Sequence, residues 1–200
     1  MRIAFDFDGV LVLTPFGRLA VHAPQPVAPL PPNFAQLYAA NASANLPRLG
    51  IEYLRFGWRR TAKDAAAVLR ELSAAHELHI VTGRSRAGIA IVRGWVRRRG
   101  LDGCIKDVHM APPGLRPPQH KLAIAKMLGV DVHIDDDPRT AYHLARSGVA
   151  RVYLLDHAGS LGGTPSQTRR EEPPDSLTLV RSLREFAAEI ARADGAAPLR

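Results

Sequence analysis

The stretch "VDVHIDDDPRTA", residues 130–141, decides the fold that we predict. A short apolar run stops at three consecutive aspartates, Asp135, Asp136 and Asp137, and a helix-type pattern follows. A strand that ends in acidic residues and continues into a helix is typical of parallel α/β sheets, whose ligands lie at the carboxyl ends of the strands. Because adjacent carboxylates repel one another, we expect a cation to offset this cluster.

The rest of the chain alternates strand-like and helix-like segments in the same way. Further strands are predicted at 2–7, 77–83, 103–110 and 150–156. Helices are predicted at 61–76 (with Thr61 as N-cap), 85–100, 119–129, 137–148 and 176–193. The alternation predicts an α/β fold, a three-layer Rossmann-like parallel sheet of five strands with helices on both faces.

Two segments interrupt the alternation. Residues 14–60 begin Pro-rich and continue as two helical patterns, which indicates a small helical cap inserted after the first strand. Residues 157–176 are rich in Gly, Pro and polar residues, so a mobile loop is expected there. The predicted catalytic core therefore comprises 1–13 and 61–200, with this loop inside it.

The composition limits the class of protein and its partners. The 200 residues are 46% hydrophobic, enough for one core, and the formal net charge of +8 suits an anionic partner such as a phosphorylated metabolite or a nucleic acid. The single cysteine, Cys104, excludes an internal disulfide. With no signal peptide and no apolar run long enough to span a membrane, we expect a cytoplasmic protein.

Acidic residues also follow the first strand. The motif "DFDG" supplies Asp6 and Asp8, and Gly9 permits a sharp exit from the strand. Together with Asp135 and Asp136, these carboxylates would meet across neighbouring strand ends. Mg²⁺ binds through one or two carboxylates and retains positions for water and substrate phosphate, so it is the cation we predict.

Three further positions suit a phosphate. Thr82 ends a strand and offers a hydroxyl, and Gly83 offers an unobstructed backbone N–H. Lys121 opens a helix and adds a compact positive charge. Arg84 follows the Thr-Gly pair and is a candidate substrate contact, although an exposed loop arginine explains it equally well.

In these motifs the sequence resembles the haloacid dehalogenase superfamily of phosphohydrolases. "DFDG", Thr82 in "IVTGR", Lys121 and "HIDDDP" match its four motifs in order. The resemblance implies that Asp6 is the nucleophile and a Mg²⁺ ligand, and that Asp8 is the general acid and base and offers its backbone carbonyl to Mg²⁺. It also implies that Thr82 and Lys121 bind the transferring phosphoryl group. The short motifs resemble the 5′(3′)-deoxyribonucleotidase branch in particular.

The resemblance also implies that Asp136 completes the metal site, with Asp135 or Asp137 as its partner, because three consecutive aspartates leave the register open by one. We choose Asp136 as the direct ligand and Asp135 as its neighbour. The position of Asp137 before Pro138 favours a role as N-cap of the helix that Pro138 opens. The histidines show no metal-ligand spacing, so His109, His120 and His133 are expected to be packed or solvated.

The predicted function is a Mg²⁺-dependent phosphomonoester hydrolase acting on a small phosphorylated metabolite, first of all a nucleotide. The alternatives are a phosphatase of nucleic-acid ends, a phosphotransferase, or a non-catalytic phosphate-binding module. A response-regulator receiver also combines Asp, Thr, Lys and Mg²⁺, but its acidic pair comes first and its phosphorylated Asp precedes Thr and Lys. Here the second acidic cluster follows Thr82 and Lys121.

Overall fold

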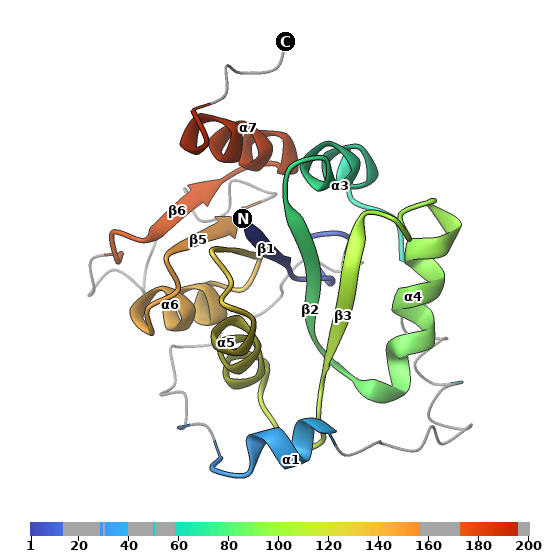
Figure 1. The fold of residues 1–200 in the computed structure, drawn as a ribbon, viewed down its shortest axis with the longest axis vertical. Coiled ribbons are helices and arrows are strands. Elements are labelled where there is room, and N and C mark those ends of the chain that lie inside the picture. The colour runs from blue at the N-terminus through green and yellow to red at the C-terminus, as the bar shows by residue number, and fades with distance from the viewer. Residues whose placement is uncertain (14–28, 30, 40–49, 51–58, 157–172, 196–200) are drawn as a thin grey trace.

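One parallel sheet organises the chain in the computed structural model (Figure 1), which describes residues 1–13, 29, 31–39, 50, 59–156 and 173–195. Its strands lie in the order β3 (Ile105–Ala111), β2 (Glu77–Ser85), β1 (Arg2–Phe5), β4 (Val132–Asp135), β5 (Arg151–Leu155) and β6 (Leu177–Val180). All neighbouring pairs are parallel. β1 lies in the middle between β2 and β4, so the ends of the strands that carry the predicted motifs are adjacent.

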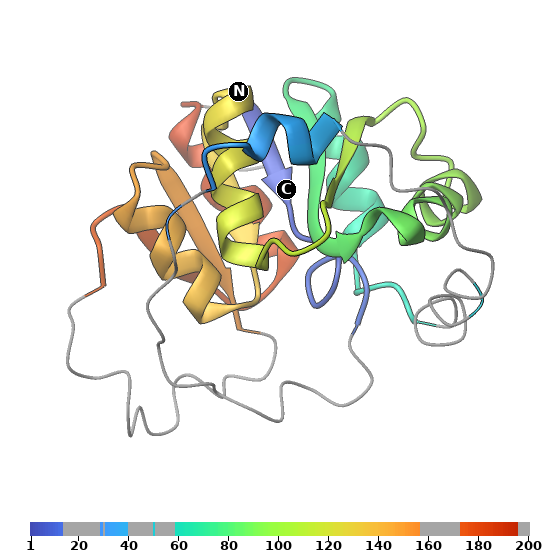
Figure 2. The same cartoon turned by 90° about the horizontal axis from the view of Figure 1, so that it is seen from below.

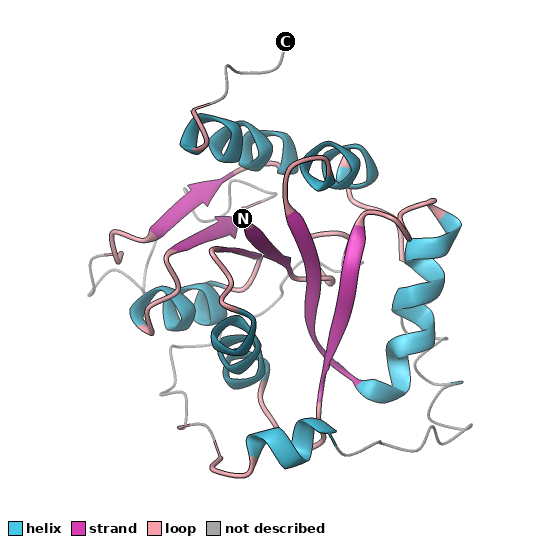
Figure 3. Ribbon diagram, in the orientation of Figure 1, coloured by secondary structure: helices cyan, strands magenta, loops and turns pink. Residues whose placement is uncertain are grey.

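Helices cover both faces of the sheet (Figure 3). One face packs against α3 (Ala65–Ser73), α4 (Ile89–Arg98) and α7 (Leu183–Ala193). The other packs against α1 (Phe34–Ala39), α5 (Pro117–Leu128) and α6 (Pro138–Arg146). A short 3₁₀ helix, η1 (Arg86–Gly88), links β2 to α4. The predicted three-layer α/β architecture is confirmed.

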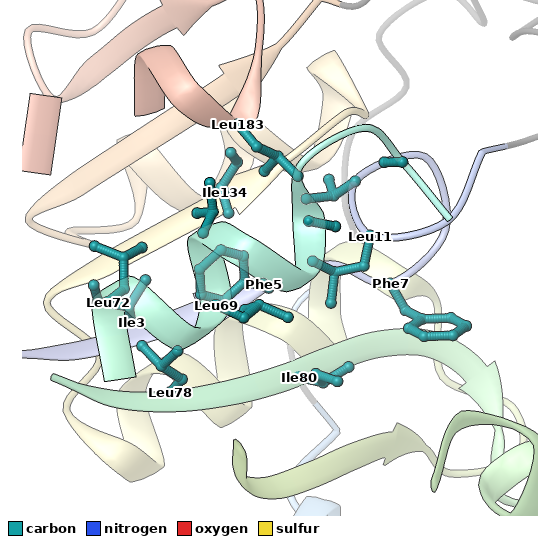
Figure 4. Packing of buried hydrophobic residues seen from close by; sticks show 14 of the residues in the cluster. Ile3, Phe5, Phe7, Leu11, Leu69, Leu72, Leu78, Ile80, Ile134 and Leu183 are labelled. Carbon is teal, nitrogen blue, oxygen red and sulfur yellow. The ribbon is translucent and has the colours of Figure 1, made fainter. Parts of the chain in front are cut away.

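The central strands are apolar on both sides because both faces are covered. In β1, Ile3 and Phe5 join the cluster with α3 and α7, while Ala4 between them joins the cluster with α5 and α6. Successive strand side chains point to opposite faces, which explains this division. Figure 4 shows the first cluster, where Phe5 and Leu69 lie between the strands and the helices.

The sheet has a sixth strand that we did not predict. β6 occupies residues that the sequence suggested as the start of the last helix, and that helix, α7, begins only at Leu183. The segment "LTLV" pairs in register with β5, and Ser182 accepts a hydrogen bond from the backbone N–H of Glu185 as the N-cap of α7. The prediction of a helix from 176 was therefore wrong, because pairing with β5 decides this short segment.

Thr61 does not cap α3, so this prediction was also wrong. The helix begins at Ala65 after the N-cap Asp64, and Thr61 forms an antiparallel bridge with Val12. Its hydroxyl accepts a hydrogen bond from Nε of Arg99 at 2.6 Å.

Part of the predicted cap is seen as α1, which lies beside β3 and α5 (Figures 1 and 2). Phe34 is buried in the core, and the Tyr38 hydroxyl hydrogen-bonds Nδ1 of His109 at 2.8 Å. Most of the insertion, including the second predicted helix, lies outside the described residues, as does most of the predicted loop 157–176. The domain boundaries stay a prediction. Among the helices of the described residues, none is long and apolar enough to cross a membrane.

Candidate active site

A buried lysine lies between two buried aspartates at the carboxyl ends of β1 and β4. Nζ of Lys121 is 3.0 Å from Oδ1 of Asp6 and 2.7 Å from Oδ2 of Asp135. The backbone N–H of Asp6 also donates to the carbonyl of Ile134 at 3.0 Å, which ties the end of β1 to β4. Three predicted site residues from distant parts of the sequence therefore meet at one point.

Asp136 completes an acidic cluster with Asp6 and Asp135. One carboxylate oxygen of each lies within 4.8 Å of the others, close enough to hold one metal ion. Gly9 makes room for Asp136, because a Cβ atom at Gly9 would lie 2.0 Å from Oδ2 of Asp136. Gly9 also has a φ of +88°, a backbone conformation that residues with a side chain strongly disfavour. The glycine of "DFDG" thus leaves the space that the carboxylate of Asp136, just after β4, occupies beside it.

The charges of this cluster fit a divalent cation. Three carboxylates gather around the ammonium group of Lys121, which contacts two of them, Asp6 and Asp135. Burial raises the pKa of Asp6 well above its usual range, Lys121 lowers it in part, and Asp135 and Asp136 raise it further. A cation among these oxygens would favour the ionised form of Asp6. The residues present therefore fit Mg²⁺, which binds hard oxygen ligands.

Asp135 is fixed by several partners. Burial raises its pKa, but Lys121 and then His133 outweigh burial and hold the pKa below its usual range. Nε2 of His133 lies 3.1 Å from Oδ2, and the backbone N–H of Asp137 donates to Oδ1 at 2.9 Å. Both oxygens of Asp135 are thus engaged by the protein, and the carboxylate of Asp136 lies against Gly9. The choice of Asp136 as the direct ligand stays a prediction.

Asp8 binds two arginines. Arg84 donates to it twice, from Nε to Oδ2 at 2.5 Å and from Nη2 to Oδ1 at 2.6 Å, and Nη1 of Arg59 also donates to Oδ1. The reading of Arg84 as an exposed loop residue was wrong, because its guanidinium is buried and lies over the ring of Phe7 at 5.1 Å. Through its side chain, then, Asp8 contacts arginines rather than the acidic cluster.

Thr82 and Gly83 lie within β2, which continues to Ser85, rather than at its end. The pairing with β3 shifts between Thr82 and Ser85, so the strand is irregular there. Thr82 is buried, and its hydroxyl accepts from the backbone N–H of Arg84 at 3.3 Å. A Cβ at Gly83 would lie 2.7 Å from the ring of Pro117, so this glycine lets β2 and the start of α5 approach closely.

The remaining assignments were made from position. Asp137 is the N-cap of α6 with Pro138 as its first residue, as predicted, and the Thr140 hydroxyl donates to its side chain at 2.7 Å. His109, His120 and His133 are all buried, as expected for packed residues.

Sequence reasoning did not identify two contacts of the site, those of His133 and Arg59. His133 could have been found, because it lies two residues before Asp135 on a strand and so shares its face. Arg59 stands at the end of the insertion, and nothing in its local sequence links it to Asp8.

Comparisons with known proteins rest on structure alone. No family profile matches this sequence, and no curated protein matches it. Among solved structures, a "predicted phosphatase" from Clostridium acetobutylicum is similar with 13% identity and a TM-score of 0.58, covering 96% of this chain and 98% of that one. A 2-haloacid dehalogenase from Pseudomonas syringae pv. Tomato DC3000 has 15% identity and a TM-score of 0.55 with the same coverage. CbbY from Rhodobacter sphaeroides, in complex with phosphate, has 17% identity and a TM-score of 0.53, covering 92% and 95%.

These likenesses define the class of fold. The chain has the haloacid dehalogenase-like fold, a Rossmann-like parallel sheet between two layers of helices, with an acidic cluster at the carboxyl ends of its central strands. The three structures give no specific support to the deoxyribonucleotidase branch.

Proposed function

We propose that this chain is a Mg²⁺-dependent phosphomonoester hydrolase that works through an aspartyl-phosphate on Asp6. The observation that carries the proposal is the buried cluster of Asp6, Asp135 and Asp136 with Lys121 in contact with Asp6. Phosphoryl transfer needs a positioned nucleophile and positive charge around the phosphoryl oxygens, and this cluster combines both. The phosphate bound by the similar CbbY structure is in keeping with this chemistry.

Asp6 begins the reaction as the nucleophile. One of its carboxylate oxygens attacks phosphorus, the bond from phosphorus to the ester oxygen breaks, and Asp8 gives its proton to the departing oxygen. Lys121, Thr82 and the backbone N–H of Gly83 bind the phosphoryl oxygens during this transfer.

Asp8 then acts as the base for hydrolysis. Its carboxylate takes a proton from a water molecule, whose oxygen attacks phosphorus of the aspartyl-phosphate. The bond from phosphorus to Asp6 breaks, and inorganic phosphate leaves. The contacts of Arg84 with both oxygens of Asp8 hold this carboxylate in one orientation for the two proton transfers.

Asp6, Asp136 and the backbone carbonyl of Asp8 would hold Mg²⁺, with Asp135 beside them. When bound, the ion supplies positive charge to the phosphoryl oxygens and keeps Asp6 ionised.

The proposed substrate is a small phosphorylated metabolite. A nucleotide is tested first, because the short motifs resemble the 5′(3′)-deoxyribonucleotidase branch. Phosphorylated nucleic-acid ends and transfer of the phosphoryl group to another acceptor are the alternatives, because the net charge of +8 also suits a larger anion.

Phosphate release tests the proposal. Nucleotides, sugar phosphates and 5′- or 3′-phosphorylated oligonucleotides are incubated with and without Mg²⁺, using the wild type, Asp6→Asn and Asp137→Asn. Release should require Mg²⁺ and be lost in Asp6→Asn, whereas Asp137→Asn should keep it, because asparagine also serves as an N-cap. Release that survives Asp6→Asn contradicts the aspartyl-phosphate. A folded protein that binds Mg²⁺ but releases no phosphate from any substrate points to the non-catalytic phosphate-binding module.

A further inference from the structure

We infer that the substrate carries a second anionic group, which binds in a pocket formed by Arg59, Arg98 and Arg99 next to Asp8. This inference rests on the proposed function and names the substrate class of the same site, a phosphomonoester with a further phosphate or carboxylate. The pocket is lined by these three arginines, by the rings of Phe7 and Trp95, and by Val12 and Ile91.

The size of the pocket suits a small anion. Its volume is about 90 Å³. Since a single water molecule needs roughly 10–15 Å³ on this measure, the pocket admits several waters or one tetrahedral oxyanion. A cavity of this size, lined by three arginines and two aromatic rings, fits one phosphate or carboxylate better than the extended backbone of a nucleic acid, which binds along open basic grooves.

Two of its arginines have positive charge that the described chain does not neutralise. Arg99 donates to the Thr61 hydroxyl and, at 3.5 Å, to the carbonyl of Trp95, which are both neutral acceptors. Burial lowers the pKa of Arg99, and the positive charge of Arg98 lowers it further. Within the described residues, neither Arg98 nor Arg99 pairs with a carboxylate. An anion between them would relieve this repulsion.

Trp95 lines the pocket and carries a further donor. Its side chain is only 3% exposed, and its indole N–H has no hydrogen-bond partner in the described parts of the chain. The ring meets Phe7 edge to face at 5.4 Å, and the guanidinium of Arg99 lies over it at 4.7 Å. A buried indole N–H can only donate, so an oxyanion is the kind of ligand that would satisfy it.

The pocket is linked to the catalytic aspartates by two residues. Phe7 stands between Asp6 and Asp8 in the chain and forms one wall. Arg59 both lines the pocket and donates to Oδ1 of Asp8. An anion in the pocket would compete with Asp8 for Arg59 and leave Oδ1 of Asp8 with fewer donors, so that it can exchange a proton with the leaving group. Binding of the second anion would thus prepare the general acid.

The test compares substrates that differ by one anionic group. The pairs are fructose 6-phosphate with fructose 1,6-bisphosphate, and glycerol 3-phosphate with 3-phosphoglycerate. For each pair, kcat/KM is measured for the wild type, Arg98→Gln and Arg97→Gln, where Arg97 is an exposed neighbour on α4 outside the pocket. The wild type should prefer the doubly anionic member. Arg98→Gln should reduce this preference about tenfold, the effect of losing one charge-assisted hydrogen bond, and Arg97→Gln should keep it. An equal kcat/KM for both members in the wild type, or a preference that Arg98→Gln leaves intact, overturns the inference.

A binding measurement separates this inference from the proposed function. Asp6→Asn is titrated calorimetrically with the same pairs in the presence of Mg²⁺, so that no turnover is needed. Tighter binding of the doubly anionic member, weakened when Arg98→Gln is added, supports the pocket even if the wild type hydrolyses none of the four compounds. Hydrolysis of all four with equal Kd values within each pair overturns the pocket and leaves the proposed function standing.

Discussion

Arg84 binds Asp8 through both of its carboxylate oxygens, with Nε 2.5 Å from Oδ2 and Nη2 2.6 Å from Oδ1. This planar fork fixes the direction in which Asp8 points, which a lysine, as a single point charge, cannot do. We therefore expect Arg84→Lys to lower kcat with the best substrate by on the order of tenfold to a hundredfold, the range known for a misplaced catalytic group.

The matched control for Arg84→Lys is Arg93→Lys. Arg93 forms an exposed ion pair with Asp107, with Nη2 of Arg93 3.7 Å from Oδ1 of Asp107. Because exposed ion pairs contribute little, replacing Arg93 should leave kcat at the wild-type value. Steady-state kinetics of the two variants decide the question. If Arg84→Lys turns over as fast as Arg93→Lys, the fork has no part in positioning Asp8.

Lys121 is the second residue whose removal should have a large effect. It is buried between Asp6 and Asp135, so Lys121→Met would leave two buried carboxylates without their cation. Breaking a buried ion pair in this way costs about 3–5 kcal/mol of unfolding free energy. Lys126→Met, at an exposed position on the same helix, should change the unfolding free energy by less than about 0.5 kcal/mol. Urea unfolding at pH 7.5 measures both, and equal losses would contradict the buried pairing.

Gly9 and Gly114 offer a matched pair of substitutions. Both have positive φ, +88° and +81°, so alanine at either position costs roughly 1 kcal/mol of backbone strain. Only at Gly9 would the added Cβ overlap the carboxylate of Asp136, whereas nothing lies within 4 Å of a Cβ at Gly114. We expect Gly9→Ala to weaken Mg²⁺ binding by at least about tenfold, because a displaced carboxylate is a lost ligand. Gly114→Ala should bind Mg²⁺ like the wild type in calorimetry, and equal affinities of the two variants would show that Asp136 does not depend on Gly9.

The layers of the fold were predictable from sequence because strands and helices alternate strongly. The apolar segments at 2–7 and 130–135 are bounded by acidic residues and glycine, and both form strands of the parallel sheet. β6 could not be found in this way, because its four residues adjoin an amphipathic helix and their pairing partner, β5, is separated from them by more than twenty residues. Short strands of this kind are decided by tertiary pairing rather than by local pattern.

The candidate site was predictable where its residues lie at the end of a strand or, like Lys121, near the start of a helix. Asp6, Asp135 and Asp136 do, and they meet as expected. Arg84 was ambiguous because a loop arginine after a strand is usually solvated, and only the fold brings Asp8 within reach of its guanidinium. The arginines at the end of α4 have a sufficient local explanation, since cations stabilise a helix C-terminus. These arginines line one pocket together with Arg59, and they do so only because the chain comes back to the core at the end of the insertion.

His120 should make the stability of the protein depend on pH. Its side chain is fully buried between α5 and the sheet, and Nε2 lies 3.3 Å from the carbonyl of His109. Burial lowers the pKa of His120 from 6.5 to about 4, the hydrogen bond to the His109 carbonyl opposes this shift, and Lys121, His109 and Arg86 add to it. In the unfolded chain the same group titrates near 6.5. The unfolded state therefore takes up the proton first, and the unfolding free energy falls as the pH decreases from about 6.5 to about 4.

The size of this loss can be measured with His120→Gln, which stays neutral and can still donate to the His109 carbonyl. Because each unit of pKa shift corresponds to about 1.4 kcal/mol, His120 accounts for at most about 3 kcal/mol of the loss across that range. Urea unfolding of the wild type and His120→Gln between pH 7.5 and 4.5 should give similar free energies above pH 7 and a shallower decline for the variant below pH 6.5. His143 is partly exposed, and burial lowers its pKa as well. His143→Gln should therefore reduce the loss of unfolding free energy at low pH less than His120→Gln does. Parallel curves for wild type and His120→Gln would mean that His120 accepts a proton in the folded state as readily as in the unfolded chain.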